Sequence, residues 1–231
     1  FIAMRAVSAA TQSRSSWRRK VSALERLSES QKQSLEQATA RSHENLEAAL
    51  PYLARRGISE QTANTYRLGV VPVGGATMGD ERYEGRLAIP YITANRDVVA
   101  LRFRSITDES PKYLSRTGTT THLFGVSCLL GDSTDAVVVE GEIDQMTLTQ
   151  MGVTSVGIPG VKAYKKSWRH LFTDFDRIIV LADGDEPGRD FARSMVNELG
   201  AVMVELPAGE DTNSIYVNHG PDQLKEILRA L

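Results

Sequence analysis

The segment RIIVLADGDEPGRD, residues 177–190, places a run of apolar residues directly before two aspartates, Asp183 and Asp185, that are one residue apart. A continuous apolar run of this length is typical of a strand that is covered on both faces. Two carboxylates so close together repel each other, and folded proteins usually separate like charges. The segment therefore predicts a buried strand that ends where a positively charged partner is bound.

Strand-like and helix-like runs also alternate on both sides of this segment. From residue 132 onward, strand-like runs (DAVVVE, TSVGIP, RIIVLAD, AVMVELP) alternate with helix-like runs (IDQMTLTQMG, KKSWRHLF, GRDFARSMVNELG, PDQLKEILRAL). Strands that alternate with short helices are typical of βαβ units. Residues 131–231 therefore predict an α/β domain, Rossmann-like, with a mostly parallel sheet and flanking helices.

The part of the chain before residue 131 has a different pattern. Residues 46–130 contain short helix signals, the Gly-rich run VVPVGGATMGD, and two strand-like runs, RLAIPYI and VVALRFR, joined by TANRD as in a hairpin. Alternation with period two puts Leu101 and Phe103 on one face and Arg102 and Arg104 on the other. The following run, ESPKYLSRTGTTTHLFGV, reads mainly as loop. These residues predict a smaller, basic, mixed α/β lobe.

A helical N-terminal extension is expected over residues 1–45. Residues 12–49 contain neither Gly nor Pro, and their leucines, Leu24 among them, are sparse. This composition predicts one or two polar helices with a thin apolar stripe.

Composition restricts the class of protein. The chain has 231 residues, of which 41% are hydrophobic and 24% charged, as in ordinary soluble domains. It has no apolar run long enough to cross a membrane and no signal-peptide pattern. The single cysteine, Cys128, excludes a disulfide framework and a cysteine-rich zinc site. We therefore expect a cytoplasmic protein with no membrane association and no zinc in this chain.

Charge is distributed unevenly along the chain. The net charge is +4 over residues 1–60, +2 over residues 61–116 and −8 over residues 117–231. The basic part is suited to a polyanion and the acidic part to metal cations. Uneven scatter by chance is the alternative, and composition does not decide between the two.

Three acidic clusters follow strands of the predicted parallel sheet. They are Glu140, Glu142 and Asp144; then Asp183 and Asp185; then Glu210 and Asp211 with Asn213. Ligands bind beyond the carboxyl ends of parallel strands, where the turns at Gly141 and Gly184 would let these groups converge. Taken singly, Asp144 could instead cap its helix, and Asp185 and Glu186 could interact with the positive N-terminus of the next helix. Glu210 and Asp211 could be solvated loop acids.

Taken together, the clusters favour a metal. A group of unpaired carboxylates would cost several kcal/mol without a counter-ion. A hard divalent cation with oxygen ligands removes that cost, and Mg²⁺ suits carboxylates combined with substrate phosphates.

These motifs resemble a known family. The runs VVVEGEID, LADGDEPGRD and LPAGEDTN are similar, in order and spacing, to the signature of the TOPRIM domain shared by DnaG-type primases, topoisomerases and some nucleases. Upstream, LARRGISEQTANTYRLGVVP and GRLAIPYI…VVALRFRS…SPKYLS resemble the opening of the DnaG catalytic core. The resemblance covers about residues 46–231, and EGEID and EDTN are closest to the primase part of phage primase–helicases.

The resemblance implies a role for particular residues. It implies that Glu140, Asp183 and Asp185 are catalytic. It also implies that two Mg²⁺ or Mn²⁺ ions are bound, with Asp183 and Asp185 as the main ligands, Glu140 as a further ligand, and Asp144 and Asp211 as supporting ligands. Nucleic-acid or nucleotide binding is implied for a basic set: Arg56, Arg86, Arg102, Arg104, Lys112 and Lys162. Asn213 stands where many relatives carry a second Asp, so one ligand is expected to be weakened, and His122 stands near the place of a lysine.

The function that the resemblance implies is primer synthesis. A DNA primase core would join ribonucleoside triphosphates on a single-stranded DNA template during replication, with a replicative helicase or a separate zinc-binding module as partner. Two alternatives remain open: a TOPRIM nuclease or phosphodiesterase, and a non-catalytic TOPRIM interaction module of a replication complex. The acids could hold metal in all three.

Overall fold

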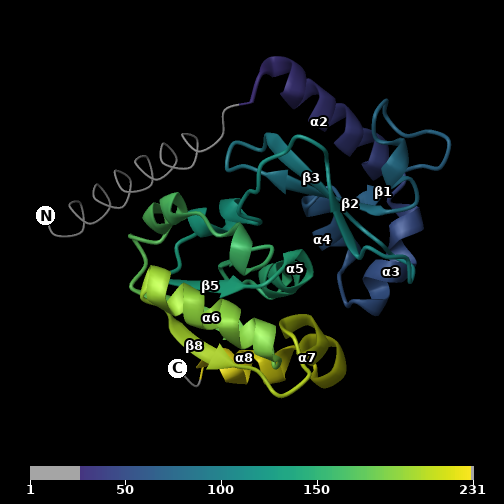
Figure 1. The fold of residues 1–231 in the computed structure, drawn as a ribbon. Coiled ribbons are helices and arrows are strands. Elements are labelled where there is room, and N and C mark those ends of the chain that lie inside the picture. The colour runs from purple at the N-terminus through teal and green to yellow at the C-terminus, as the bar shows by residue number, and fades with distance from the viewer. Residues whose placement is uncertain (1–26, 230–231) are drawn as a thin grey trace, which may run out of the picture.

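Two four-stranded sheets form the framework of the computed structural model, which describes residues 27–229 (Figure 1). The first sheet is antiparallel, in the order β1 (Gly69–Val70), β2 (Leu87–Ile92), β3 (Val98–Arg104) and β4 (Tyr113–Ser115). The second is parallel, in the order β6 (Ser155–Gly157), β5 (Asp135–Val139), β7 (Arg177–Ala182) and β8 (Val202–Glu205). The predicted parallel sheet and the hairpin of β2 and β3 are confirmed.

Helices cover both faces of the first sheet. On one face, α2 (Glu29–His43) packs Leu35 and Ala38 against Leu101 and Phe103 of β3. On the other, α3 (Leu50–Arg55) and α4 (Glu60–Thr65) pack against β2. The thin apolar stripe expected in this region is thus the buried side of α2. The rest of the expected N-terminal helical segment, with Leu24, lies outside the described residues.

The second sheet is also covered on both faces (Figure 1). One face packs against α6 (Glu186–Leu199) and the 3₁₀ helices η3 (Val126–Leu130) and η5 (Lys166–Leu171). The other packs against α5 (Glu142–Gln150), α7 (Thr212–His219) and α8 (Pro221–Arg229). The helix expected over KKSWRHLF is η5, and α7 was not among the expected helices.

The two sheets share a hydrophobic core. Ile143 and Met146 on α5 belong to the same buried cluster as Tyr91 of β2 and Val99 of β3. This packing holds the carboxyl edge of the parallel sheet against the first sheet. No helix within residues 27–229 is long and apolar enough to cross a bilayer.

Candidate active site at the edge of the parallel sheet

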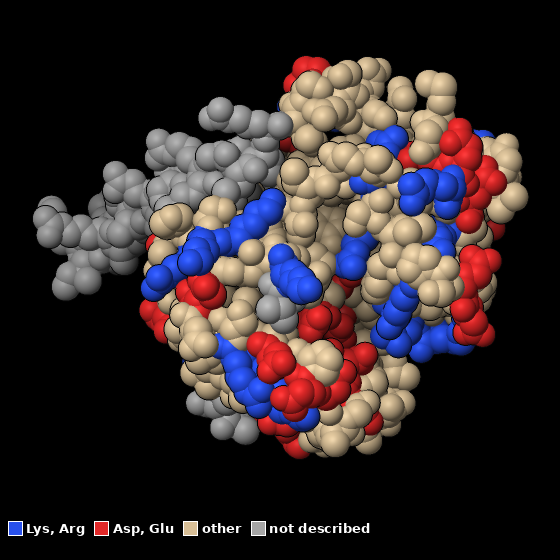
Figure 2. Space-filling view, in the orientation of Figure 1, with Lys and Arg blue, Asp and Glu red and all other residues tan. Residues whose placement is uncertain are grey.

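A pocket of about 300 Å³ lies between the carboxyl edge of the parallel sheet and the first sheet. One wall is acidic and the other basic. The acidic wall contains Glu140, Glu142, Asp144, Asp183, Asp185 and Asp211, and the basic wall contains Arg56, Arg102, Arg104 and Lys112. Figure 2 shows acidic side chains gathered on the part of the molecule built around the second sheet, beside a hollow with Lys and Arg around it. All five predicted metal ligands and four of the six predicted basic residues therefore meet in one pocket.

Strand ends place the two central acids. Glu140 directly follows β5, and Asp183 directly follows β7, which pairs with β5 in parallel. After Glu140 the chain turns at Gly141, whose φ of 125° disfavours any other residue. The sequence predicts a sharp turn at Gly184, but glycine is needed there because of close packing. A Cβ at this position would lie 1.9 Å from the carbonyl oxygen of Pro207. Its small size lets the segments after β7 and β8 come into contact.

Two of the acids that line the pocket, Asp185 and Asp211, also cap helices. Asp185 accepts a hydrogen bond from the backbone N–H of Gly188 (2.7 Å) at the start of α6. Asp211 accepts one from Ser214 (2.5 Å) at the start of α7. The capping alternative for Asp185 is therefore correct, but it does not remove the side chain from the pocket. Asp211 is a cap and not a freely solvated loop acid.

Asp144 reaches a helix other than its own. Its Oδ1 accepts a hydrogen bond from the backbone N–H of Asn213 (2.9 Å) in α7, and α5, the helix that contains Asp144, has no side-chain cap. The acid therefore ties α5 to α7 and does not cap its own helix.

The acids raise one another's pKa. The pKa of Asp183 rises to about 8, first because the side chain is buried and then because Asp144, Asp211, Glu140 and Asp185 are near. Burial and then Asp211 raise the pKa of Asp144 to about 7. The pKa of Glu140 is raised by burial and by Asp185. Negative charge is thus concentrated here beyond what the surrounding cations offset.

The acidic wall fits a magnesium-type cation. Within residues 27–229, no three His, Cys, Asp or Glu side chains form a ready-made metal cage. Mg²⁺ does not require one, because it commonly binds one or two carboxylates and completes its shell with water and substrate phosphates. The available donors are carboxylate oxygens, which suit Mg²⁺ or Mn²⁺.

Aromatic rings hold the basic wall in place. The guanidinium of Arg104 donates a hydrogen bond to the hydroxyl of Tyr113 and lies over the rings of Tyr113 (4.9 Å) and Tyr52 (5.7 Å). Burial, followed by Arg104 and Arg56, lowers the pKa of Lys112. Arg56 is 3.9 Å from Asp211, so the two walls touch at this point.

Two predicted basic residues lie outside the pocket lining. Arg86 donates a hydrogen bond to the carbonyl oxygen of Pro111 (2.8 Å) and is 4.0 Å from Glu109, so it supports the segment before Lys112. Lys162 is exposed in η4 (Val161–Ala163), two residues after Gly160 of the lining.

Glu142 was expected only as one member of an acidic cluster, and the structure buries it in the wall. It is 1% exposed, and its Oε1 accepts hydrogen bonds from Arg102 (2.7 Å) and from the hydroxyl of Tyr91 (2.5 Å). The only sequence signal was its position two residues after Glu140. Glu142 therefore links α5 to β2 and β3.

Asn213 has a structural role that the sequence reading missed. Its side chain donates hydrogen bonds to the carbonyl oxygen of Arg56 (2.7 Å) and to the hydroxyl of Thr147 (2.8 Å), and it is not among the residues that line the pocket. An aspartate could not donate these two bonds. Asn213 was expected to be a weakened metal ligand. In the structure it is instead a buried amide that joins α7 to α5 and to the residue after α3.

Comparisons with known proteins agree with this geometry. A Toprim-like family model matches residues 137–216. The Gene 57 protein of Mycobacterium phage D29 is 40% identical over 149 residues, which cover 62% of this chain and 98% of that protein. The DNA primase of Haemophilus influenzae is 24% identical; the match covers 79% of this chain and 38% of that primase, so the chain spans well under half of its length.

Solved structures show the same fold. The structure of the DnaG primase catalytic domain bound to single-stranded DNA superposes with a TM-score of 0.73 at 21% identity, and the match covers 87% of this chain and 78% of that one. At this identity the similarity establishes the fold.

Proposed function

Because the chain belongs to the Toprim superfamily, in the branch of DnaG-type primase catalytic cores, we propose that it synthesises short RNA primers on single-stranded DNA. In this reaction a 3′-hydroxyl attacks the α-phosphate of a ribonucleoside triphosphate, and pyrophosphate leaves. The observation that carries the proposal is the single pocket in which an acidic wall faces a basic wall. Such a pocket supplies both a cation site and phosphate contacts, the two requirements of phosphoryl-type transfer.

The acidic wall would hold the metal. Asp183, Asp185 and Glu140 are the proposed ligands, and Asp144 and Asp211 are supporting acids. When bound, one or two Mg²⁺ or Mn²⁺ ions neutralise charge on the phosphates and assist ionisation of the attacking hydroxyl. Glu140, whose pKa is raised by burial and by Asp185, could instead accept the proton of the hydroxyl as a general base.

The basic wall would hold the phosphates of template and nucleotide. Arg104 and Lys112 come from the first sheet and the loop beside it, and Arg56 follows α3. The lowered pKa of Lys112 reflects a partly desolvated ammonium, which an arriving phosphate would stabilise. Lys162, which is exposed outside the pocket, would bind nucleic acid beyond the reacting groups, whereas the buried Arg86 would act by holding the segment before Lys112.

A primer-synthesis assay tests the proposal. The protein is incubated with single-stranded DNA, labelled ribonucleotides and Mg²⁺, and the products are separated by length. We expect labelled RNA primers, which EDTA abolishes. Glu140→Gln and Asp183→Asn should each lower the rate at least about 100-fold, whereas Asp190→Asn, an exposed acid on α6 outside the pocket, should not.

The same assay distinguishes the alternatives. Shortened DNA would support a nuclease. The absence of both primers and cleavage products would support an interaction module. Normal synthesis by either pocket variant would refute the site assignment.

The partners are proposed from the same reaction. A primase core needs a means of reaching its template, and we propose a replicative helicase or a zinc-binding module on another chain or segment. The place of action would be the cytoplasm of a bacterium or of a phage-infected host, where the DNA template is found.

A further inference from the structure

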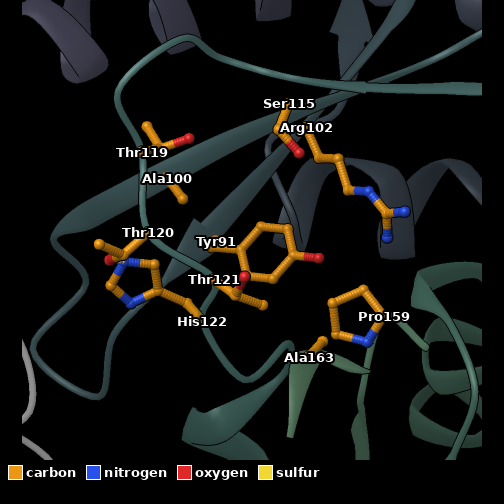
Figure 3. Close-up of a pocket in the computed structure, with 10 residues that line it drawn as sticks. All are labelled: Tyr91, Ala100, Arg102, Ser115, Thr119, Thr120, Thr121, His122, Pro159 and Ala163. Carbon is orange, nitrogen blue, oxygen red and sulfur yellow. Dashed lines mark hydrogen bonds between the residues drawn. The ribbon is translucent and has the colours of Figure 1, made fainter. Parts of the chain in front are cut away.

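A second, smaller pocket adjoins the acidic one (Figure 3). It has a volume of about 120 Å³ and differs in its chemistry. Thr119, Thr120 and Thr121, together with His122, form one side, and among residues 27–229 no carboxylate or lysine lines the pocket. The pocket therefore suits a neutral ligand that forms hydrogen bonds, such as a sugar or a base.

Arg102 lies at the boundary between the two pockets. It lines both of them, as does Pro159. Figure 3 shows its guanidinium and the hydroxyl of Tyr91 extending toward Pro159, away from Thr120 and His122. A molecule that occupied both pockets would pass this guanidinium.

Two contacts hold Arg102 in this place, and a third holds its partner Glu142. Its Nη1 donates a hydrogen bond to Glu142 (2.7 Å), and its guanidinium lies over the ring of Tyr113, 4.2 Å from the ring centre. Glu142 in turn accepts a hydrogen bond from Tyr91 (2.5 Å). The carboxylate is buried, but the Arg102 side chain remains 22% exposed and lines both pockets.

Stability alone is a poor explanation for this pair. Taking the carboxylate of Glu142 out of water costs several kcal/mol, and an ion pair with a buried member often contributes no net stability. Moreover, the second oxygen of Glu142 is buried and has no hydrogen-bond partner within the described part of the chain. Because burying this ion pair costs desolvation free energy, its place at the junction of two pockets is better explained by a role in ligand binding.

We infer that Glu142 and Arg102 act as one unit that positions the nucleotide, with Arg102 contacting it where the triphosphate meets the ribose. This inference rests on the proposed function. The phosphates lie in the acidic and basic pocket, and the nucleoside lies in the hydroxyl-lined pocket. Glu142 does not touch the nucleotide; it is a positioning residue that holds the guanidinium in the required orientation.

Equilibrium binding of ATP in the presence of Mg²⁺, measured by isothermal titration calorimetry, tests the unit. Arg102→Lys keeps the charge but loses the planar fork, and we expect about tenfold weaker binding, equal to about 1.4 kcal/mol. Glu142→Gln should weaken binding about fivefold, although it touches no ligand. The double variant should bind no more weakly than Arg102→Lys alone, because the two residues act together. In primer synthesis, KM for ATP should rise more than kcat falls.

Asp80→Asn is a matched control. Asp80 pairs with Arg116 at 2.9 Å, its side chain is 2% exposed, and neither residue lines either pocket. This variant should lose stability, as Glu142→Gln does, but keep the wild-type affinity for ATP. Thermal melts of all variants would show that each is folded.

A further variant tests the hydroxyl-lined pocket. Thr121→Val replaces only the hydroxyl by a methyl, on a residue that is exposed. We expect weaker binding of ATP and unchanged binding of inorganic tripolyphosphate, which has no nucleoside. Equal effects on both probes would place the nucleoside elsewhere.

Other outcomes separate this inference from the proposed function. If Glu142→Gln binds ATP as the wild type does, or if the two substitutions add, the unit does not exist. If the wild type makes primers while every variant binds ATP normally, only this inference is wrong. If the wild type neither binds ATP nor makes primers, the proposed function fails, and this inference with it.

Discussion

Burial, followed by the charges of four neighbouring acids, raises the pKa of Asp183 further than that of Asp144. Its pKa of about 8, against an ordinary value of 3.8, means that the folded protein keeps a proton that the unfolded chain has released between about pH 4 and pH 8. Stability without metal is therefore greatest at the low end of this range and is lost as the pH rises through 8. Asp144, with a pKa of about 7, contributes in the same direction.

We therefore predict that metal-free protein loses about 2–4 kcal/mol of unfolding free energy between pH 5 and pH 8.5. Urea unfolding in EDTA at several pH values measures this. Asp183→Asn removes the titrating group and should reduce the loss, and Mg²⁺ should restore stability more at pH 8.5 than at pH 5. Stability that rises with pH in EDTA would show that Arg56 and Lys112 already neutralise the cluster.

Gly184 offers a test of packing at a single residue. A Cβ at this position would lie 1.9 Å from the carbonyl oxygen of Pro207, and backbone must move to relieve the clash. We predict that Gly184→Ala costs about 3 kcal/mol of unfolding free energy. Gly131→Ala is the control, since a Cβ there meets nothing closer than 3.5 Å, and an equal loss in both would point to a general effect of replacing glycine.

Residues whose role comes from their own segment could be predicted, and residues whose role comes from a distant partner could not. Glu140 and Asp183 follow strands that the apolar runs reveal, so their convergence follows from the parallel order. Glu142 depends on Arg102, 40 positions away, and Asn213 on the backbone of Arg56, 157 positions away. Neither pairing leaves a periodic signal in the sequence.

Helices and strands also differ in whether their own sequence or a distant partner determines them. The four strands of the parallel sheet carry apolar runs that identify them. By contrast β1 and β4 have 2 and 3 residues, too few for an alternating pattern, and they exist because β2 and β3 offer free edges. Helix α7 begins with Thr212, Asn213 and Ser214, residue types that favour turns, and only its cap at Asp211 hints at a helix.

Helix α2 provides a prediction at the scale of the element. Leu35 is 3% exposed and packs in the cluster that contains Leu101 and Phe103 of β3. We predict that Leu35→Ala lowers the unfolding free energy by about 2–4 kcal/mol, because it leaves a cavity under the first sheet. Urea unfolding measures this, with the exposed Gln33→Ala as control. A loss below about 0.5 kcal/mol would mean that α2 is a dispensable extension.

At the scale of the whole molecule, the shared core explains how opposite charges can face each other. Ile143 and Met146 of α5 are buried in the same cluster as Tyr91 of β2, next to the pair of Glu142 and Arg102. Hydrophobic packing thus sets the distance between an acidic wall and a basic wall that belong to different sheets. The division of the chain at residues 45 and 130 stays a prediction, whereas the joining of the two sheets is a property of the fold.

This arrangement predicts how DNA binding responds to salt. Although the net charge of the chain is −2, a single strand that follows the basic wall would contact Arg56, Arg104 and Lys112 and release counter-ions. A plot of the logarithm of the binding constant against the logarithm of the salt concentration should then have a slope of about −2, because each of the three phosphate contacts contributes about −0.7. Fluorescence anisotropy of labelled single-stranded DNA, in EDTA and without nucleotide, measures the slope. Lys112→Gln should reduce its magnitude by about 0.7. Lys225→Gln, on α8 beside Asp222, should not change the slope, and equal effects of the two variants would show that DNA lies on another face.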